Sequence, residues 1–264
     1  MSNFENGHDN AQENMNLGWD ASRHNQVVER LLKGENVQSI LESLPGFSES
    51  FDHPLDTIDC SDGRVLDGRK IGIAGSGMLL SEKERDLFIQ NYRGKIKKLT
   101  THRDCGAAGI AFRSLGEGEI PEGISSADEY GTYQGKKLAE ALGAEHEFIE
   151  KLANDYHNEV AIVLDSTGTF DSTSIADFPA HFVCSGAGLG FSEEYMKTEL
   201  KTLAGIALGS HGFGQRFTEE NPLYIIVTAN SNVEGLFWKT IAEVALADFS
   251  GKVAIKSFVR PQIS

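Results

Sequence analysis

The stretch Cys60-Ser61-Asp62-Gly63-Arg64 decides how the rest of the chain is interpreted, because it acquires a chemical meaning together with His102-Arg103-Asp104-Cys105. Two thiolates and one imidazole form a ligand set that suits Zn²⁺. Three protein ligands leave the fourth tetrahedral position for water, which is typical of a catalytic rather than a structural zinc site. The sequence therefore predicts a Zn²⁺ centre with Cys60, His102 and Cys105 as its ligands.

Asp62 and Arg64 are the polar residues closest to the first predicted ligand. The guanidinium fork of an arginine can hold a carboxylate through two parallel hydrogen bonds. We therefore expect Asp62 and Arg64 to form a pair beside the metal and to be the catalytic residues of the site.

The two motifs, C-x-D-x-R at the end of one strand and H-x-x-C after a later strand, are similar to those of the β-class carbonic anhydrases. Val65 and the pair Gly106-Ala107 agree with that family as well, and the resemblance covers about residues 22–175. It implies an α/β fold with a mostly parallel sheet flanked by helices, and reversible hydration of CO₂ to bicarbonate. In that family the Asp–Arg pair orients a zinc-bound hydroxide toward CO₂, and the same role is implied here for Asp62 and Arg64.

Two alternatives stay open at this point. The same fold could hydrolyse a sulfur analogue such as carbonyl sulfide or CS₂, because residues around the pocket depart from the family pattern: Phe51 and Asp52 stand where a glutamine is frequent. The chain could also be a non-catalytic zinc-binding scaffold that binds a partner through its last ninety residues.

Composition narrows the class of partner. The 264 residues carry a net charge of −15, which argues against binding to nucleic acid or to an anionic membrane surface. With two of the three cysteines assigned to a metal, no disulfide framework is expected. No signal peptide or membrane-spanning run is visible. These features predict a cytoplasmic protein that acts on a small molecule.

The chain divides into three predicted parts. Residues 1–21 are predicted to be a disordered or partner-draped arm, residues 22–175 a carbonic-anhydrase-like zinc domain, and residues 176–264 an additional α/β extension. Within the second part we expect strands at 55–60, 69–74, 95–101 and 160–164, a helix at 127–156 that is either continuous or broken near Gly143, and a closing hairpin after residue 164. The extension alternates strands at 180–184, 222–228 and 252–259 with helices at 192–208 and 233–247.

The extension contains a weak echo of the metal motifs. The stretch 181–188, with Cys184, resembles the first motif, and Asn230 follows a strand as His102 does. One interpretation is a degenerate repeat that has lost its metal; the other is an ordinary extension with one buried cysteine. The resemblance implies a homodimer or a higher oligomer, whereas a repeat would let one chain imitate a dimer.

Other polar residues carry weaker predictions. Asp104 is either a charge at a helix start or a participant in catalysis. By residue type alone, four histidines are proton-shuttle candidates, although each is more typical of a surface or structural histidine: His53, His146, His157 and His181. The glycines of Gly72-x-x-Gly75-x-Gly77 lack nucleotide-binding spacing and predict a tight turn beside the metal.

Overall fold

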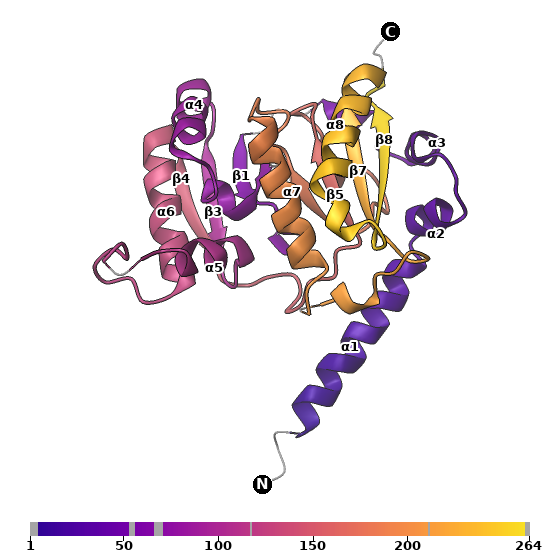
Figure 1. The fold of residues 1–264 in the computed structure, drawn as a ribbon, viewed down its shortest axis with the longest axis horizontal. Helices are drawn as coiled ribbons and strands as arrows, with labels where there is room; N and C mark the ends of the chain where they lie inside the picture. Colours follow the sequence, from indigo (N-terminus) through magenta and orange to yellow (C-terminus); the bar gives the residue numbers. More distant parts are fainter. Residues whose placement is uncertain (1–4, 53–55, 66–70, 117, 211, 262–264) are drawn as a thin grey trace.

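Two four-stranded parallel sheets form the framework of the chain (Figure 1). The computed structural model describes residues 5–52, 56–65, 71–116, 118–210 and 212–261. The first sheet has the order β2-β1-β3-β4 and consists of β1 (Thr57–Cys60), β2 (Ile71–Ile73), β3 (Lys98–His102) and β4 (Glu145–Ile149). The second has the order β6-β5-β7-β8 and consists of β5 (Ala161–Asp165), β6 (His181–Cys184), β7 (Leu223–Ala229) and β8 (Val253–Val259). The predicted α/β class, with parallel strands flanked by helices, is confirmed.

Helices connect most of the successive strands, because a parallel pair needs a crossover connection, whereas the described residues between β1 and β2 and between β5 and β6 hold only a short 3-10 turn. The first sheet carries α4 (Glu82–Tyr92), α5 (Gly106–Arg113) and α6 (Ala127–Leu142), and the second carries α7 (Glu193–Ala207) and α8 (Asn232–Ala245). Capping boxes start α4 at Ser81 and α6 at Ser126, each closed by a glutamate three residues later. No helix in the described parts of the chain has the length and apolar character needed to cross a membrane.

The N-terminal segment, predicted to be a disordered or partner-draped arm, is helical over the residues that the structure describes. It forms α1 (Glu5–Arg23), followed by α2 (Gln26–Leu32) and α3 (Val37–Glu42). Trp19 anchors α1. Its ring packs edge to face against Phe213 and Phe217, with distances between ring centroids of 5.2 Å and 5.4 Å. The sequence concealed this contact because α1 has few apolar residues and its anchor lies on a distant loop.

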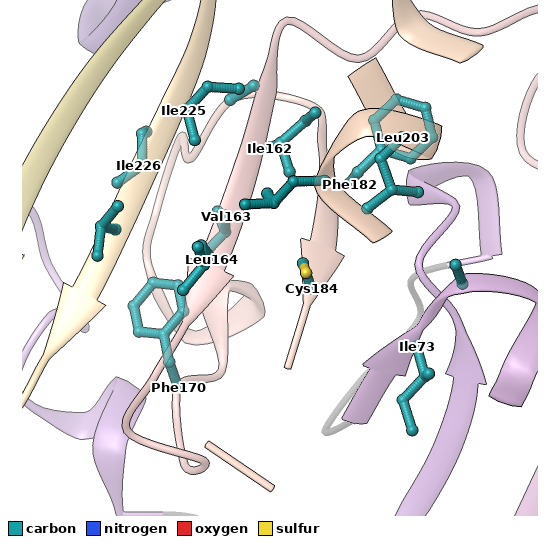
Figure 2. Packing of buried hydrophobic residues seen from close by; sticks show 14 of the residues in the cluster. Ile73, Ile162, Val163, Leu164, Phe170, Phe182, Cys184, Leu203, Ile225 and Ile226 are labelled. Carbon is teal, nitrogen blue, oxygen red and sulfur yellow. The ribbon is translucent and has the colours of Figure 1, made fainter. Parts of the chain in front are cut away.

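The two sheets meet through the edge strands β2 and β6. Ser185 N donates to Gly72 O at 2.8 Å, and Val183 N donates to Ser61 O at 2.9 Å. Gly72 is required there, because a Cβ atom at this position would lie 2.7 Å from the Cβ of Val183. Figure 2 shows part of the continuous core, with Ile73 from the first sheet and Phe182 and Cys184 from the second.

Counted along the chain, both sheets have the same strand order: second, first, third, fourth. A duplicated unit would give this arrangement. The boundary between the two sheets, however, lies before β5 and not at residue 175, where the sequence placed it. β5 pairs in parallel with both β6 and β7, so residues 161–165 belong to the second sheet and the expected hairpin was wrong. Cys184 ends β6, the counterpart of β2, so it does not correspond to Cys60; the counterpart of Cys60 lies at the end of β5, near Asp165.

The predicted helix at 127–156 was wrong beyond residue 142. Gly143 adopts a left-handed conformation with φ of 74° and ends α6. The chain then forms β4, which lies at the edge of the first sheet and is only partly buried. Its polar sequence, Glu145-His146-Glu147, conceals the strand because an edge strand needs few apolar residues.

Candidate metal centre

The carboxyl ends of two neighbouring strands deliver the first two predicted ligands. Cys60 is the last residue of β1, His102 is the last residue of β3, and the two strands pair in parallel. Cys105 follows three residues later as the N-cap of α5. Ligands in α/β folds bind at this end of the strands, and the amino end of α5 favours a negatively charged group there.

The three side chains converge on one buried point. Cys60 Sγ and Cys105 Sγ are 3.7 Å apart, and the ligand atoms of Cys60, His102 and Cys105 all lie within 4.8 Å of one another. None of the three residues is more than 5% exposed. His102 Nδ1 donates to Arg103 O at 2.7 Å, so the tautomer leaves Nε2 for the cluster. Within the described residues, Nε2 is buried without a hydrogen-bond partner, and the group could hold a metal ion.

Without a metal, the cluster has strongly shifted acid–base properties. The hydrogen bond from Cys105 lowers the pKa of Cys60 well below its usual value against the opposing effect of burial, and the same bond together with burial raises the pKa of Cys105. Burial disfavours a charged His102, but the negative charge on Cys60 outweighs it and raises the pKa of the imidazole to about 9. A bound cation would replace these protons, because metal ligands must be deprotonated.

Asp62 and Arg64 form the predicted pair. Arg64 Nη2 donates to Asp62 Oδ2 at 2.6 Å and Arg64 Nε donates to Oδ1 at 3.0 Å. The Arg64 backbone N–H also donates to Oδ1, because both residues lie at the short helical turn of Gly63–Val65. Burial alone would raise the pKa of Asp62, but the hydrogen bonds from Arg64 and the positive charges nearby lower it. Asp62 is thus held as a carboxylate with Oδ2 3.8 Å from His102 Nε2.

A second buried cluster, which the motifs did not predict, adjoins this pair. Asp62, His157 and Glu159 have side-chain atoms within 4.8 Å of one another. His157 Nδ1 lies 3.2 Å from Glu159 Oε2 and 4.0 Å from Asp62 Oδ1. Glu159 is 1% exposed, and burial raises its pKa. The sequence shows only that two polar residues, His157 and Glu159, precede the buried strand β5. It does not show that their side chains lie close to Asp62.

A cavity of about 730 Å³ opens beside the ligands. Cys105 and Gly106 contribute one wall at the start of α5, while Arg64 and His157 line it from the side of Asp62. Ile206 of α7 lines it as well, so the second half of the chain forms part of the pocket. Among the described residues, His157 is therefore the histidine, apart from the predicted ligand His102, that both approaches Asp62 and lines the cavity.

The other predicted candidates lie elsewhere or have structural roles. His146 is paired with Thr101 Oγ1 at 3.0 Å on the first sheet. His181 is buried between Ser172 Oγ and Pro179 O. Asp104 lines the cavity and adopts a left-handed conformation with φ of 55°, while His53 lies outside the described residues.

The predicted tight turn is confirmed, and it lies beside Cys60, the first predicted ligand. Residues Ala74–Gly77 form a short helical turn, η3, in which Gly75 and Ser76 have left-handed conformations. The Gly75 N–H donates to Cys60 Sγ at 3.3 Å. The turn therefore contacts the first ligand directly.

Comparison of this chain with protein-family models, curated proteins and solved structures gave no match.

Proposed function

We propose that this chain is a zinc-dependent enzyme that hydrates CO₂ reversibly to bicarbonate. The observation that carries the proposal is the buried carboxylate of Asp62, which Arg64 holds 3.8 Å from the imidazole of a Cys–His–Cys group. A buried, ionised carboxylate fixed beside the three ligands is a group that could orient a nucleophile, which a metal centre serving only to stabilise the fold would not require.

The donor set fits Zn²⁺. Two thiols and one imidazole nitrogen are preferred zinc ligands, and the unpartnered His102 Nε2 is the atom that such an ion would satisfy. When bound, the ion supplies a hydroxide nucleophile at neutral pH by lowering the pKa of water.

Asp62 and Arg64 provide orientation in this proposal. Asp62 is ionised and can only accept hydrogen bonds. With Oδ1 and Oδ2 fixed by the Arg64 fork, the carboxylate accepts the hydrogen of the nucleophile and directs a lone pair toward the substrate carbon. Arg64 also keeps Asp62 from turning inward and becoming a fourth ligand.

His157 provides the route for the proton that each hydration releases. Its ring lies between Asp62 and the cavity, and Glu159 accepts a hydrogen bond from Nδ1. The bond to Glu159 fixes the orientation of the ring, and imidazole is the side chain that most often accepts and passes on protons in catalysis. The proton then leaves from His157 to solvent in the cavity.

The size of the cavity favours a second candidate substrate. A space of about 730 Å³ is much larger than CO₂ requires, and carbonyl sulfide or CS₂ could use the same nucleophile and the same carboxylate.

Stopped-flow hydration of CO₂ at saturating zinc tests the proposal, with Asp62→Asn as the paired variant. We expect activity in the wild type and a loss of about 10²- to 10⁴-fold in the variant, which is the range for a positioned acid–base group. Full zinc occupancy without hydration of CO₂ would instead indicate a scaffold protein, and turnover of carbonyl sulfide alone would identify the alternative substrate.

A further inference from the structure

Glu199 is a completely buried carboxyl group that the proposed chemistry does not use. It lies in the middle of α7, in the second half of the chain, and is 0% exposed. No lysine or arginine forms an ion pair with it in the part of the chain that the structure describes. Burial raises its pKa to about 7. An uncompensated carboxyl group in the core lowers stability, so its presence calls for a reason.

Both oxygens of Glu199 have partners near the boundary between the two sheets. Oε1 accepts from Ala74 N at 2.6 Å, and Oε2 accepts from Cys184 Sγ at 2.9 Å. The first bond connects the second half of the chain to the first, because Ala74 follows β2 and begins the turn η3. Glu199 thus fixes the first residue of a turn in the other half.

That turn is conformationally strained. Gly75 has φ of 59°, and Ser76, which is not a glycine, has φ of 54°. A non-glycine residue in this region is strained and persists only where its surroundings hold it. A Cβ atom on Gly75 would lie 3.0 Å from that of Ala107, two residues after Cys105. The turn is therefore confined between Glu199 on one side and the start of α5 on the other.

The turn also contacts the predicted metal centre. The next N–H in the chain after that of Ala74 belongs to Gly75, and it donates to Cys60 Sγ. A hydrogen bond to a thiolate ligand fixes the direction of its lone pairs, and such contacts around a metal tune its affinity. A continuous path of two hydrogen bonds leads from Glu199 through the Ala74–Gly75 backbone to Cys60.

From this path we infer that Glu199 is a positioning residue for the metal centre: it holds the η3 turn so that the Gly75 N–H meets the Cys60 sulfur. The inference rests on the metal centre of the proposed function but not on CO₂ as the substrate. It also gives the second half of the chain a role at the site of the first half, beyond the wall that Ile206 contributes.

Titration with Co²⁺, a spectroscopic substitute for Zn²⁺, tests the inference through the thiolate-to-cobalt charge-transfer band. Glu199→Leu removes both acceptors, and Glu199→Asp keeps a carboxyl group but is one methylene too short to reach Ala74 N. We expect both variants to bind Co²⁺ about 10- to 100-fold more weakly, the usual cost of losing a contact around a ligand, and to shift the band. Glu199→Gln keeps an oxygen for Ala74 N and should restore both properties.

Cys184→Ala is the matched control, because it removes the thiol that donates to Glu199 Oε2 and leaves the Ala74 bond in place. We expect this variant to bind Co²⁺ like the wild type. If Glu199→Leu does not fold, Glu199→Asp decides the question. Wild-type affinity and an unshifted band in either folded variant overturn the role of Glu199 alone. Failure of the wild type to bind Co²⁺ overturns the metal centre and this inference together, whereas binding without CO₂ hydration contradicts only the proposed enzymatic activity.

Discussion

Replacing Arg64 by alanine tests the pairing on which the proposed catalysis depends. The variant loses both fork hydrogen bonds, of 2.6 Å and 3.0 Å, and leaves Asp62 with a side chain that is only 5% exposed. Removing one member of a buried ion pair costs about 3–5 kcal/mol. We expect a loss of this size in the free energy of unfolding, measured by urea denaturation of the metal-loaded protein with tryptophan fluorescence.

The same substitution should reduce catalysis for a separate reason. Without Arg64, burial dominates and raises the pKa of Asp62 toward and above its usual value. A protonated Asp62, or one that has rotated inward to the metal, no longer accepts a hydrogen bond from the nucleophile. The expected fall in the CO₂ hydration rate is about 10²- to 10⁴-fold, with zinc retained.

Arg113→Ala provides the control for this experiment. Arg113 lines the same cavity and has the same charge, but it is exposed and lies outside the Asp62–Arg64 hydrogen bonds. We expect this variant to keep the stability and hydration rate of the wild type. The proposed role of the pair is refuted if Arg64→Ala is as stable and as fast as Arg113→Ala.

Three further predictions address the surrounding groups. His157→Ala should lower the maximal hydration rate about 10²-fold in weak buffer, with recovery on adding imidazole; a rate that is unchanged and independent of buffer would exclude proton transfer through His157. Glu199 has a folded-state pKa raised from 4.5 to about 7, so the folded state keeps its proton to higher pH than the unfolded state and the free energy of unfolding falls as pH rises from about 4.5 to 7. At 1.36 kcal/mol per pKa unit this fall is about 3 kcal/mol, and Glu199→Gln should lack it; parallel pH profiles of stability for the variant and the wild type would show that the shift is absent. Cys105→Ser replaces a thiolate ligand by a hydroxyl, so zinc measured by elemental analysis after dialysis should fall well below one per chain, and full retention would remove Cys105 from the ligand set.

The sequence predicted the parts of the site that depend on neighbouring residues. Asp62 and Arg64 are two positions apart, so a single turn brings them together, and alternation of buried strands with capped helices indicates the α/β class. Other contacts arise only in the folded chain. Ala74 and Glu199 are 125 positions apart, and nothing local indicates that α7 crosses to the turn after β2.

The wrong predictions also have local causes. β4 looks helical because an edge strand tolerates Glu145 and Glu147 on its exposed side. The hairpin after residue 164 was inferred from a turn sequence, but Asp165 instead uses its side chain to bind the N–H of Thr167 and the hydroxyl of Thr228. The chain then crosses over to β6, which pairs with β5 in parallel rather than as a hairpin.

The most direct test of the account is the CO₂ hydration rate measured as zinc is added to metal-free protein. The account predicts a rate that rises in proportion to zinc and stops rising at one zinc per chain, because the structure places one Cys–His–Cys group in the described residues. A rate that stays at the uncatalysed level at full zinc occupancy, or one that does not depend on zinc, would contradict it.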